Sequence, residues 1–220
     1  MPARLRPTAP IASEAILVGD PGRALMLAQE LLTEPKMSNH ARGLWAYTGT
    51  TEADRALTIQ ATGMGGPSAS VVLADLAELG VRRAVRIGTC TSLGELGLGE
   101  LVAVSEARED QGAFVSSEDT KAPCLPDPTL TEALRDQLPE ARVAPVISLD
   151  SLYRPERDLP STLAEVADMQ TAALLATAGE LEVALAAVLV VTEKSDSEQV
   201  RDEDLETAAK RAGRAAAAVL

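Results

Sequence analysis

Aromatic residues, cysteine and histidine are all scarce in this chain of 220 residues. Aromatic residues make up 2% of it, so any core must be built from Ala, Val, Leu and Ile. The two cysteines, Cys90 and Cys124, are too few for a disulfide framework or a structural zinc site, and His40 is the single histidine. The sequence therefore signals neither a metal site nor an organic cofactor.

Long hydrophobic runs are missing as well. No apolar stretch approaches the roughly 18 residues that a membrane span needs, and the basic N-terminal segment is not followed by the apolar region of a signal peptide. We therefore expect a cytoplasmic protein with no membrane partner. Its 46% of hydrophobic and 24% of charged residues are typical of a globular chain, and its length predicts a single domain over residues 1–220.

Positive charge is in deficit, and the formal net charge is −13. Such an acidic surface repels nucleic acids and anionic lipids at long range, so we expect no nucleic-acid partner. Any anionic ligand must therefore be small, and a local cluster of arginines must hold it.

Apolar runs typical of strands alternate along the chain with amphipathic stretches typical of helices. The runs predict strands at 15–18, 43–48, 56–61, 83–87, 101–104, 142–147 and 183–191, with 43–48 and 56–61 forming a hairpin. Helical spacing predicts helices at 23–32, 67–79, 129–138, 171–178 and 202–220. This alternation predicts an α/β fold, a three-layer α/β/α sandwich with a central mixed sheet.

Three loops that follow predicted strands carry groups suited to anion binding. They are GDPGR at 19–23, GMGGPS at 63–68 and RIGTC at 86–90. Glycines let a backbone approach a ligand closely, and helix starts offer free N–H groups. Because ligands of open α/β sheets collect beyond the carboxyl ends of the strands, the three loops are expected to form one site. A buried arginine is costly unless it is paired, so Arg86 could instead make a structural ion pair with an acidic residue.

Four segments in the same order and spacing resemble the bacterial purine nucleoside and uridine phosphorylases. They are 19–23, SNHARGLWAYTG at 38–49, TGMGGPS at 62–68 and RIGTC at 86–90. The resemblance is specific over residues 15–105 and looser towards the C-terminus. It implies a phosphorylase-like fold and family assembly as a hexamer, a trimer of dimers.

The resemblance also assigns roles to individual residues. It implies a phosphate site of Gly19, Arg23, Arg86 and Thr89, completed by Arg42 reaching across a subunit interface. It implies ribose contacts from Met64, Met169 and Gln170. Inorganic phosphate is then a co-substrate, and three arginines would bind it while offsetting the acidity of the chain locally.

The sugar motif of the family is altered here. Its Glu-Met-Glu sequence is replaced by Asp168-Met169-Gln170, and the family's N-terminal histidine has no counterpart. Gln170 can hydrogen-bond a hydroxyl but brings no charge to an oxocarbenium-like sugar. Alternatively, Asp168 and Gln170 cap the helix that begins near residue 171.

The base side of the site is open to two interpretations. A purine enzyme would use Glu193, or Asp196 with one gap, to protonate the departing base, unless these residues belong to a solvated loop. A uridine enzyme would read its base from the loop at 152–157, where Tyr153 and Arg157 are candidates but the family's glutamine is missing. Cys90 is expected beside the base, or else is a small buried apolar residue.

We therefore expect a pentosyltransferase, a nucleoside phosphorylase that converts a nucleoside and phosphate to free base and pentose 1-phosphate. The missing glutamine and Glu193 favour purine substrates over uridine. Arg86 and Glu193 are the candidate catalytic residues. A nucleosidase is disfavoured because a hydrolase does not need the three arginines. A diverged member that binds nucleoside or phosphate with weak or no catalysis is the further alternative, because of Gln170.

Overall fold

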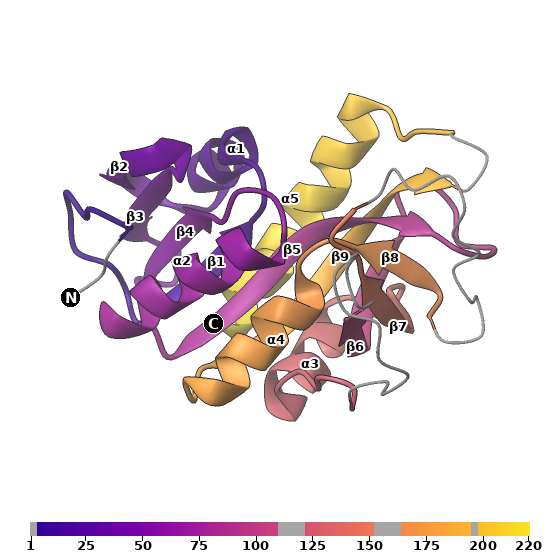
Figure 1. Ribbon diagram of the computed structural model, residues 1–220. Coiled ribbons are helices and arrows are strands. Elements are labelled where there is room, and N and C mark those ends of the chain that lie inside the picture. The colour runs from indigo at the N-terminus through magenta and orange to yellow at the C-terminus, as the bar shows by residue number, and fades with distance from the viewer. Residues whose placement is uncertain (1–3, 110–121, 152–163, 195–197) are drawn as a thin grey trace.

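The computed structural model describes residues 4–109, 122–151, 164–194 and 198–220, in which nine strands form one mixed sheet (Figure 1). The strands are β1 (Glu14–Val18), β2 (Thr33–Asn39), β3 (Ala46–Thr50), β4 (Ala56–Ala61), β5 (Arg83–Ser92), β6 (Leu101–Glu109), β7 (Arg142–Ser148), β8 (Val166–Asp168) and β9 (Ala184–Lys194). Their order in the sheet is β2-β3-β4-β1-β5-β8-β7-β6-β9.

Helices cover both faces of the sheet (Figure 1). They are α1 (Pro21–Leu31), α2 (Gly66–Glu78), α3 (Pro128–Gln137), α4 (Thr171–Glu180) and α5 (Asp202–Val219), and a 3-10 turn, η1 (Ala41–Gly43), precedes β3. Helix α2 packs against α4, whereas α5 packs against α1 and α3. Successive residues of β5, Ala84 and Val85, enter the two separate aliphatic cores on opposite faces. The predicted three-layer arrangement is therefore confirmed.

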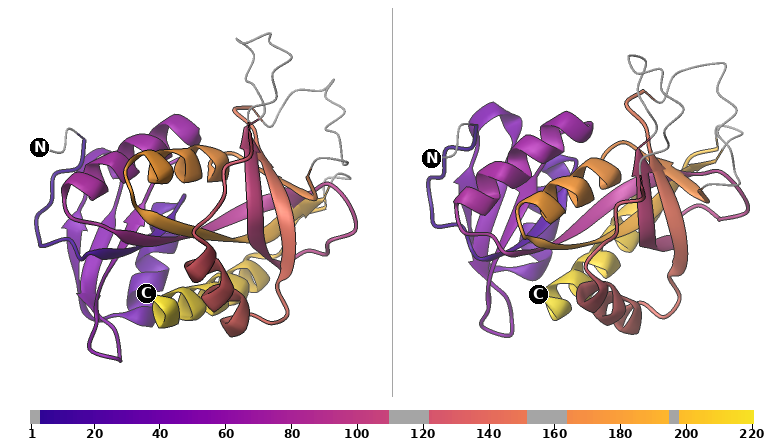
Figure 2. Two further views of the ribbon diagram at one scale, coloured as in Figure 1. Left: turned by 90° about the horizontal axis from the view of Figure 1, so that it is seen from below. Right: turned by 60° about the horizontal axis from the view of Figure 1, so that its bottom comes forward.

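One half of the sheet closes on itself (Figure 2). Strand β9 pairs with β5 in parallel and with β6 in antiparallel orientation. Strands β5, β8, β7, β6 and β9 thus form a continuous ring of hydrogen-bonded neighbours, and β1, β4, β3 and β2 extend from β5 as an open wing. The sequence did not predict this closure, because strand periodicity shows which residues face a core but not which strands pair.

The structure confirms most of the predicted elements and adds two strands. The predicted hairpin is formed by β3 and β4, with Tyr47 opposite Ile59. Strand β2 was not predicted, because its first five residues are exposed and it contains Pro35, as an edge strand tolerates. Strand β8 has only three residues, too few to show a period.

Four strands bring their carboxyl ends to one edge of the sheet. Strand β1 runs parallel to both β4 and β5, and β5 runs parallel to β9. The loops after these strands must therefore lie close together, as open α/β sheets require of a ligand site. In the described part of the chain, no helix is long and apolar enough to cross a membrane.

Candidate functional site

A pocket of about 240 Å³ opens where the loops after β1 and β4 meet β5, β8 and β9. The N–H of Thr62 donates to the Val18 carbonyl over 2.7 Å, which joins the loop after β4 to the end of β1. The pocket is lined by Gly19, Arg23, Gly63, Met64, Gly65, Arg86, Gly88, Thr89, Cys90, Thr91, Ala167, Asp168, Met169, Gln170, Thr192 and Glu193.

Nine residues singled out from the sequence line this one pocket: Gly19, Arg23, Met64, Arg86, Thr89, Cys90, Met169, Gln170 and Glu193. Arg42 does not line it. The base-side candidates Tyr153 and Arg157, with Leu152 and Asp196, lie outside the described residues. The three anion-binding loops therefore converge as expected, although their roles in binding stay predictions.

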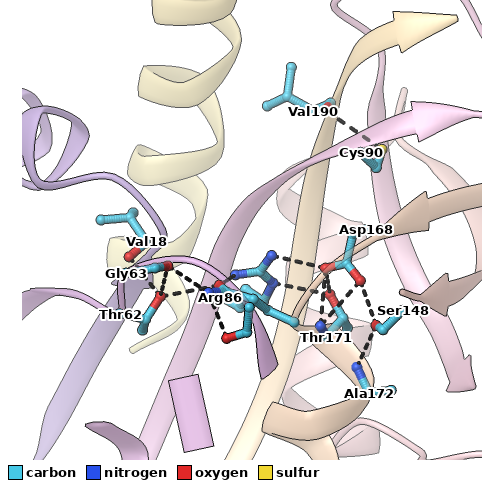
Figure 3. A network of polar contacts seen from close by, with 12 residues as sticks. Val18, Thr62, Gly63, Arg86, Cys90, Ser148, Asp168, Thr171, Ala172 and Val190 are labelled. Carbon is cyan, nitrogen blue, oxygen red and sulfur yellow. Dashed lines mark hydrogen bonds and ion pairs between the residues drawn. The ribbon is translucent and has the colours of Figure 1, made fainter. Parts of the chain in front are cut away.

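The guanidinium of Arg86 is buried on β5 and is held on three sides (Figure 3). Its Nη2 donates to Asp168 Oδ2 over 2.9 Å, its Nε to Thr171 Oγ1 over 3.0 Å and its Nη1 to Gln170 Oε1 over 2.7 Å. The expectation that a buried Arg86 pairs with an acidic residue is thus confirmed. Guanidinium carries five N–H donors, so one on each terminal nitrogen has no partner among the described residues.

Asp168 is hydrogen-bonded more completely than Arg86. Besides Arg86, its carboxylate accepts the Ser148 hydroxyl, the Thr171 hydroxyl and the Thr171 N–H, the last over 3.0 Å. Asp168 therefore caps the start of α4, as one interpretation of the sequence expected. Gln170 is the N-cap residue but makes no side-chain capping bond. Charge-assisted hydrogen bonds from every side are what offset the cost of removing this ion pair from water.

Gly88 makes room for the arginine. A Cβ added to Gly88 would lie 2.6 Å from Arg86 Nη2 and 2.7 Å from Leu189 Cδ2, both closer than real contacts allow. The side chain of Arg86 thus folds back over its own strand two residues on. This use of a glycine explains the Arg-Ile-Gly order of β5.

Arg23 presents a second cation to the same pocket. It lies in the first turn of α1, where its backbone N–H donates to Oδ1 of the N-cap Asp20 over 2.7 Å. Its guanidinium makes no hydrogen bond or ion pair with any residue that the structure describes. Burial lowers the pKa of Arg23, the nearby charge of Arg86 lowers it further, and Asp20 opposes the shift. The charges of Arg23 and Arg86 repel each other, and an anion that accepts hydrogen bonds from both would relieve that repulsion.

A β-bulge brings Glu193 into the wall of the pocket. In the β5–β9 register Cys90 pairs with Val191, but the next pair is Thr91 with Glu193, so Thr192 is the extra residue. The Thr91 hydroxyl donates to Glu193 Oε2 over 3.3 Å, and Gln199 Nε2 donates to Oε1 over 3.0 Å. Glu193 is thus a partly buried strand residue, and the interpretation of it as part of a solvated loop is wrong.

Cys90 is a neutral part of the wall. Burial raises the pKa of its thiol, the charge of Asp168 raises it further and Arg86 opposes the shift. Because the thiolate is the nucleophilic form of cysteine, the protonated Cys90 is unreactive and serves only to shape the pocket wall. It is at once a pocket residue and a small buried apolar residue, so the two interpretations of it are compatible.

Two residues with predicted ligand roles point away from the protein interior. Arg42 is exposed in η1 and has φ of 60°, a left-handed conformation that is strained for arginine. Buried Asn39 supports this turn by donating to the carbonyl of Leu44. Met64, at the tip of the glycine-rich loop, is 87% exposed.

Sequence reasoning missed three hydroxyl residues that hydrogen-bond to the charged groups of the site. Ser148 ends β7, Thr171 begins α4 and Thr91 lies in β5. Each is polar at the end of an otherwise apolar strand or at a helix start, which is a signal too common to single out a site residue. In the described part of the chain, no three His, Cys, Asp or Glu side chains are grouped so that they could hold a metal ion.

Changing Asp168 to Asn should destabilise the protein by about 3–5 kcal/mol, because it leaves the Arg86 charge buried without its counter-ion. The free energy of unfolding, from urea titration followed by circular dichroism, measures this cost. Glu140→Ala is the control, since Glu140 and Arg211 form an ion pair exposed to solvent. That change should cost less than about 1 kcal/mol. Equal effects of the two substitutions would show that the Asp168 pair is not what holds the site together.

Comparisons with known proteins agree with this geometry. Purine nucleoside phosphorylase DeoD-type of Oceanobacillus iheyensis is 42% identical over 84 residues, 38% of this chain and 35% of the relative, so that alignment spans about a third of the relative's length. Purine nucleoside phosphorylase DeoD-type of Brevibacillus brevis is 30% identical over 195 residues, 83% of this chain and 82% of the relative. Guanosine phosphorylase of Halorubrum lacusprofundi is 33% identical over 63% of this chain and 59% of the relative.

The fold and the family model give the same result. A crystal structure of purine nucleoside phosphorylase from Toxoplasma gondii in complex with immucillin-H superposes with a TM-score of 0.83, covering 95% of this chain and 90% of that one at 21% identity. The family model described as phosphorylase superfamily matches residues 14–220. Strands β1, β4, β5 and β9 run in parallel and end at the pocket that the motif residues line. The chain belongs to the phosphorylase superfamily.

Proposed function

We propose that the protein is a nucleoside phosphorylase that uses phosphate to cleave the N-glycosidic bond of a purine nucleoside, giving free base and pentose 1-phosphate. The observation that carries the proposal is Arg23, a partly buried guanidinium that makes no hydrogen bond or ion pair within the described residues and lies near Arg86 in the same pocket. A dianionic phosphate would supply acceptors for both guanidinium groups and offset their mutual repulsion.

In this proposal the phosphate lies between α1 and β5. Arg23 and Arg86 neutralise it, and Gly19 and Thr89 contact it from the adjoining strand ends. Positioning a bound nucleophile under the anomeric carbon removes much of the entropic barrier of a bimolecular reaction. A second subunit completes the site, with its Arg42 reaching the phosphate in a homo-oligomer, and the exposed and strained position of Arg42 supports this arrangement.

The nucleoside occupies the rest of the pocket. Its sugar rests against Met64 and Met169, and its base lies between Cys90 and Glu193. Glu193 protonates the base as the glycosidic bond breaks, which relieves the charge that develops on the leaving group. The relatives' names, which are those of purine and guanosine phosphorylases, favour purines over uridine.

Base release from a panel of purine and pyrimidine nucleosides tests this function directly. We expect purine release with phosphate present and none above background without it, because phosphate held by the arginines is the proposed nucleophile. Product analysis should find pentose 1-phosphate. Release that is independent of phosphate would indicate a nucleosidase, and release of uracil alone would indicate a uridine enzyme.

Glu193→Gln should slow phosphate-dependent base release by roughly 10²- to 10⁴-fold, the usual contribution of a positioned proton donor. Phosphate affinity should stay unchanged, because the partners of Glu193 are Thr91 and Gln199 and not the arginines. Glu180→Gln, the same change at an exposed position in α4, is the control. A Glu193→Gln enzyme with full activity would remove Glu193 from the reaction.

A further inference from the structure

Gln170 makes more contacts within the protein than a side chain kept free for a ligand would. It is 3% exposed at the junction of β8 and α4. Its Oε1 accepts from Arg86 Nη1 over 2.7 Å and lies 3.2 Å from the Thr62 hydroxyl. Its Nε2 donates to the Gly63 carbonyl over 2.6 Å and to the Gly65 carbonyl over 3.3 Å. The amide oxygen thus accepts from Arg86 and both amide N–H donors have acceptors, so the side chain is engaged on both its donor and its acceptor side.

The chemistry of the four partners specifies an amide. Arg86 can only donate, so it needs an oxygen, whereas the carbonyls of Gly63 and Gly65 can only accept, so they need an N–H. A carboxylate would satisfy Arg86 but would place an oxygen against the Gly63 carbonyl. An apolar side chain of the same length would satisfy neither. Glutamine is therefore the residue that joins these two sides at this distance.

The segment that Gln170 holds is rich in glycine and lies between Thr62, whose carbonyl accepts the Ser68 hydroxyl over 2.6 Å, and the start of α2. Gly63 and Gly65 both adopt positive φ, 74° and 80°, and neither has a side chain to pack. Fixing the Gly63 carbonyl also fixes the Met64 N–H, which points the opposite way from the same trans peptide. The first loop lies against this one, since a Cβ on Gly19 would lie 3.5 Å from the Gly63 carbonyl oxygen and 3.8 Å from Gln170 Oε1.

We propose that Gln170 is a positioning residue: its amide fastens the glycine-rich loop to Arg86, and it is not a sugar ligand. The loop carries Met64, and Arg86 belongs to the proposed phosphate site, so Gln170 fixes the nucleoside side of the pocket relative to the phosphate side. The assignment deepens the proposed function, on which its catalytic consequence rests. The claim that Gln170 fastens the loop to Arg86 rests only on the hydrogen bonds described above.

Two substitutions at position 170 separate a tether from a sugar ligand. Gln170→Glu keeps the length and the acceptor but removes the donor. Gln170→Met removes both the donor and the acceptor without burying a charge, so it serves as the test variant if Gln170→Glu does not fold. Gln137→Glu, the same chemical change on the exposed surface of α3, is the control. Circular dichroism verifies the fold of each variant.

Amide hydrogen exchange measures how readily the glycine-rich loop opens, and it needs no substrate. The N–H of Thr62 and the N–H of Ala69, bonded to the carbonyls of Val18 and Gly65, are protected reporters on either side of it. We expect both position-170 variants to exchange at these sites roughly tenfold faster or more, because local opening no longer breaks the amide contacts. The control should match the wild type. Unchanged exchange in the variants would overturn the tether.

Base release with phosphate then tests the consequence, on a ribonucleoside and on its 2′-deoxy analogue. We expect both variants to raise KM roughly tenfold or more for the two substrates alike, with their ratio unchanged and kcat affected less. A lower KM for the ribonucleoside alone in Gln170→Glu would identify Gln170 as the sugar ligand and overturn the proposal. If the wild type releases no base, the proposed function fails, and the exchange rates still decide whether Gln170 tethers the loop.

Discussion

The buried ion pair between Arg86 and Asp168 is the interaction on which the site depends. Two charges removed from water are tolerated only if their remaining hydrogen-bonding groups are satisfied. Ser148 at the end of β7 and Thr171 at the start of α4 donate to the Asp168 carboxylate. Gln170 accepts from Arg86 and donates to the Gly63 carbonyl, which connects the ion pair to the glycine-rich loop. The closed half of the sheet supplies these partners, because β8 can carry Asp168 beside β5 only where the ring of strands brings them together.

The same arrangement is incomplete in one respect, and the incompleteness supports the proposed function. Asp168 is shared among four donors and pairs with Arg86, whereas the Arg23 guanidinium, near Asp20, makes no ion pair among the described residues. In a chain of charge −13, two adjacent guanidinium groups attract small anions locally while the surface repels large ones. Glu193 lines the same pocket from β9, so one pocket holds both the arginines and a carboxyl group that could donate a proton to a leaving group.

The sequence predicted the parts of the molecule that local chemistry dictates. Apolar periodicity located most strands and helices, and the glycine and arginine motifs, with the altered sugar motif and Glu193, located nine of the residues that line the pocket. It could not predict edge strand β2, whose exposed, proline-containing residues show no apolar pattern, or the three-residue strand β8. It also could not show that Gln170 is fully engaged, because the carbonyls of Gly63 and Gly65 reach it from more than 100 residues away in the chain. Partnerships across the sheet are set by strand pairing, and one sequence does not encode that pairing in any local pattern.

Titration of inorganic phosphate by calorimetry tests the central claim most directly, since it needs neither a nucleoside nor turnover. The account predicts saturable binding to the wild type that is weakened roughly 10- to 100-fold by Arg23→Gln, the usual loss for one charge-assisted hydrogen bond. Arg135→Gln, at an exposed position in α3, should leave the affinity unchanged. Equal phosphate binding by wild type and Arg23→Gln, or no binding by either, would contradict the account.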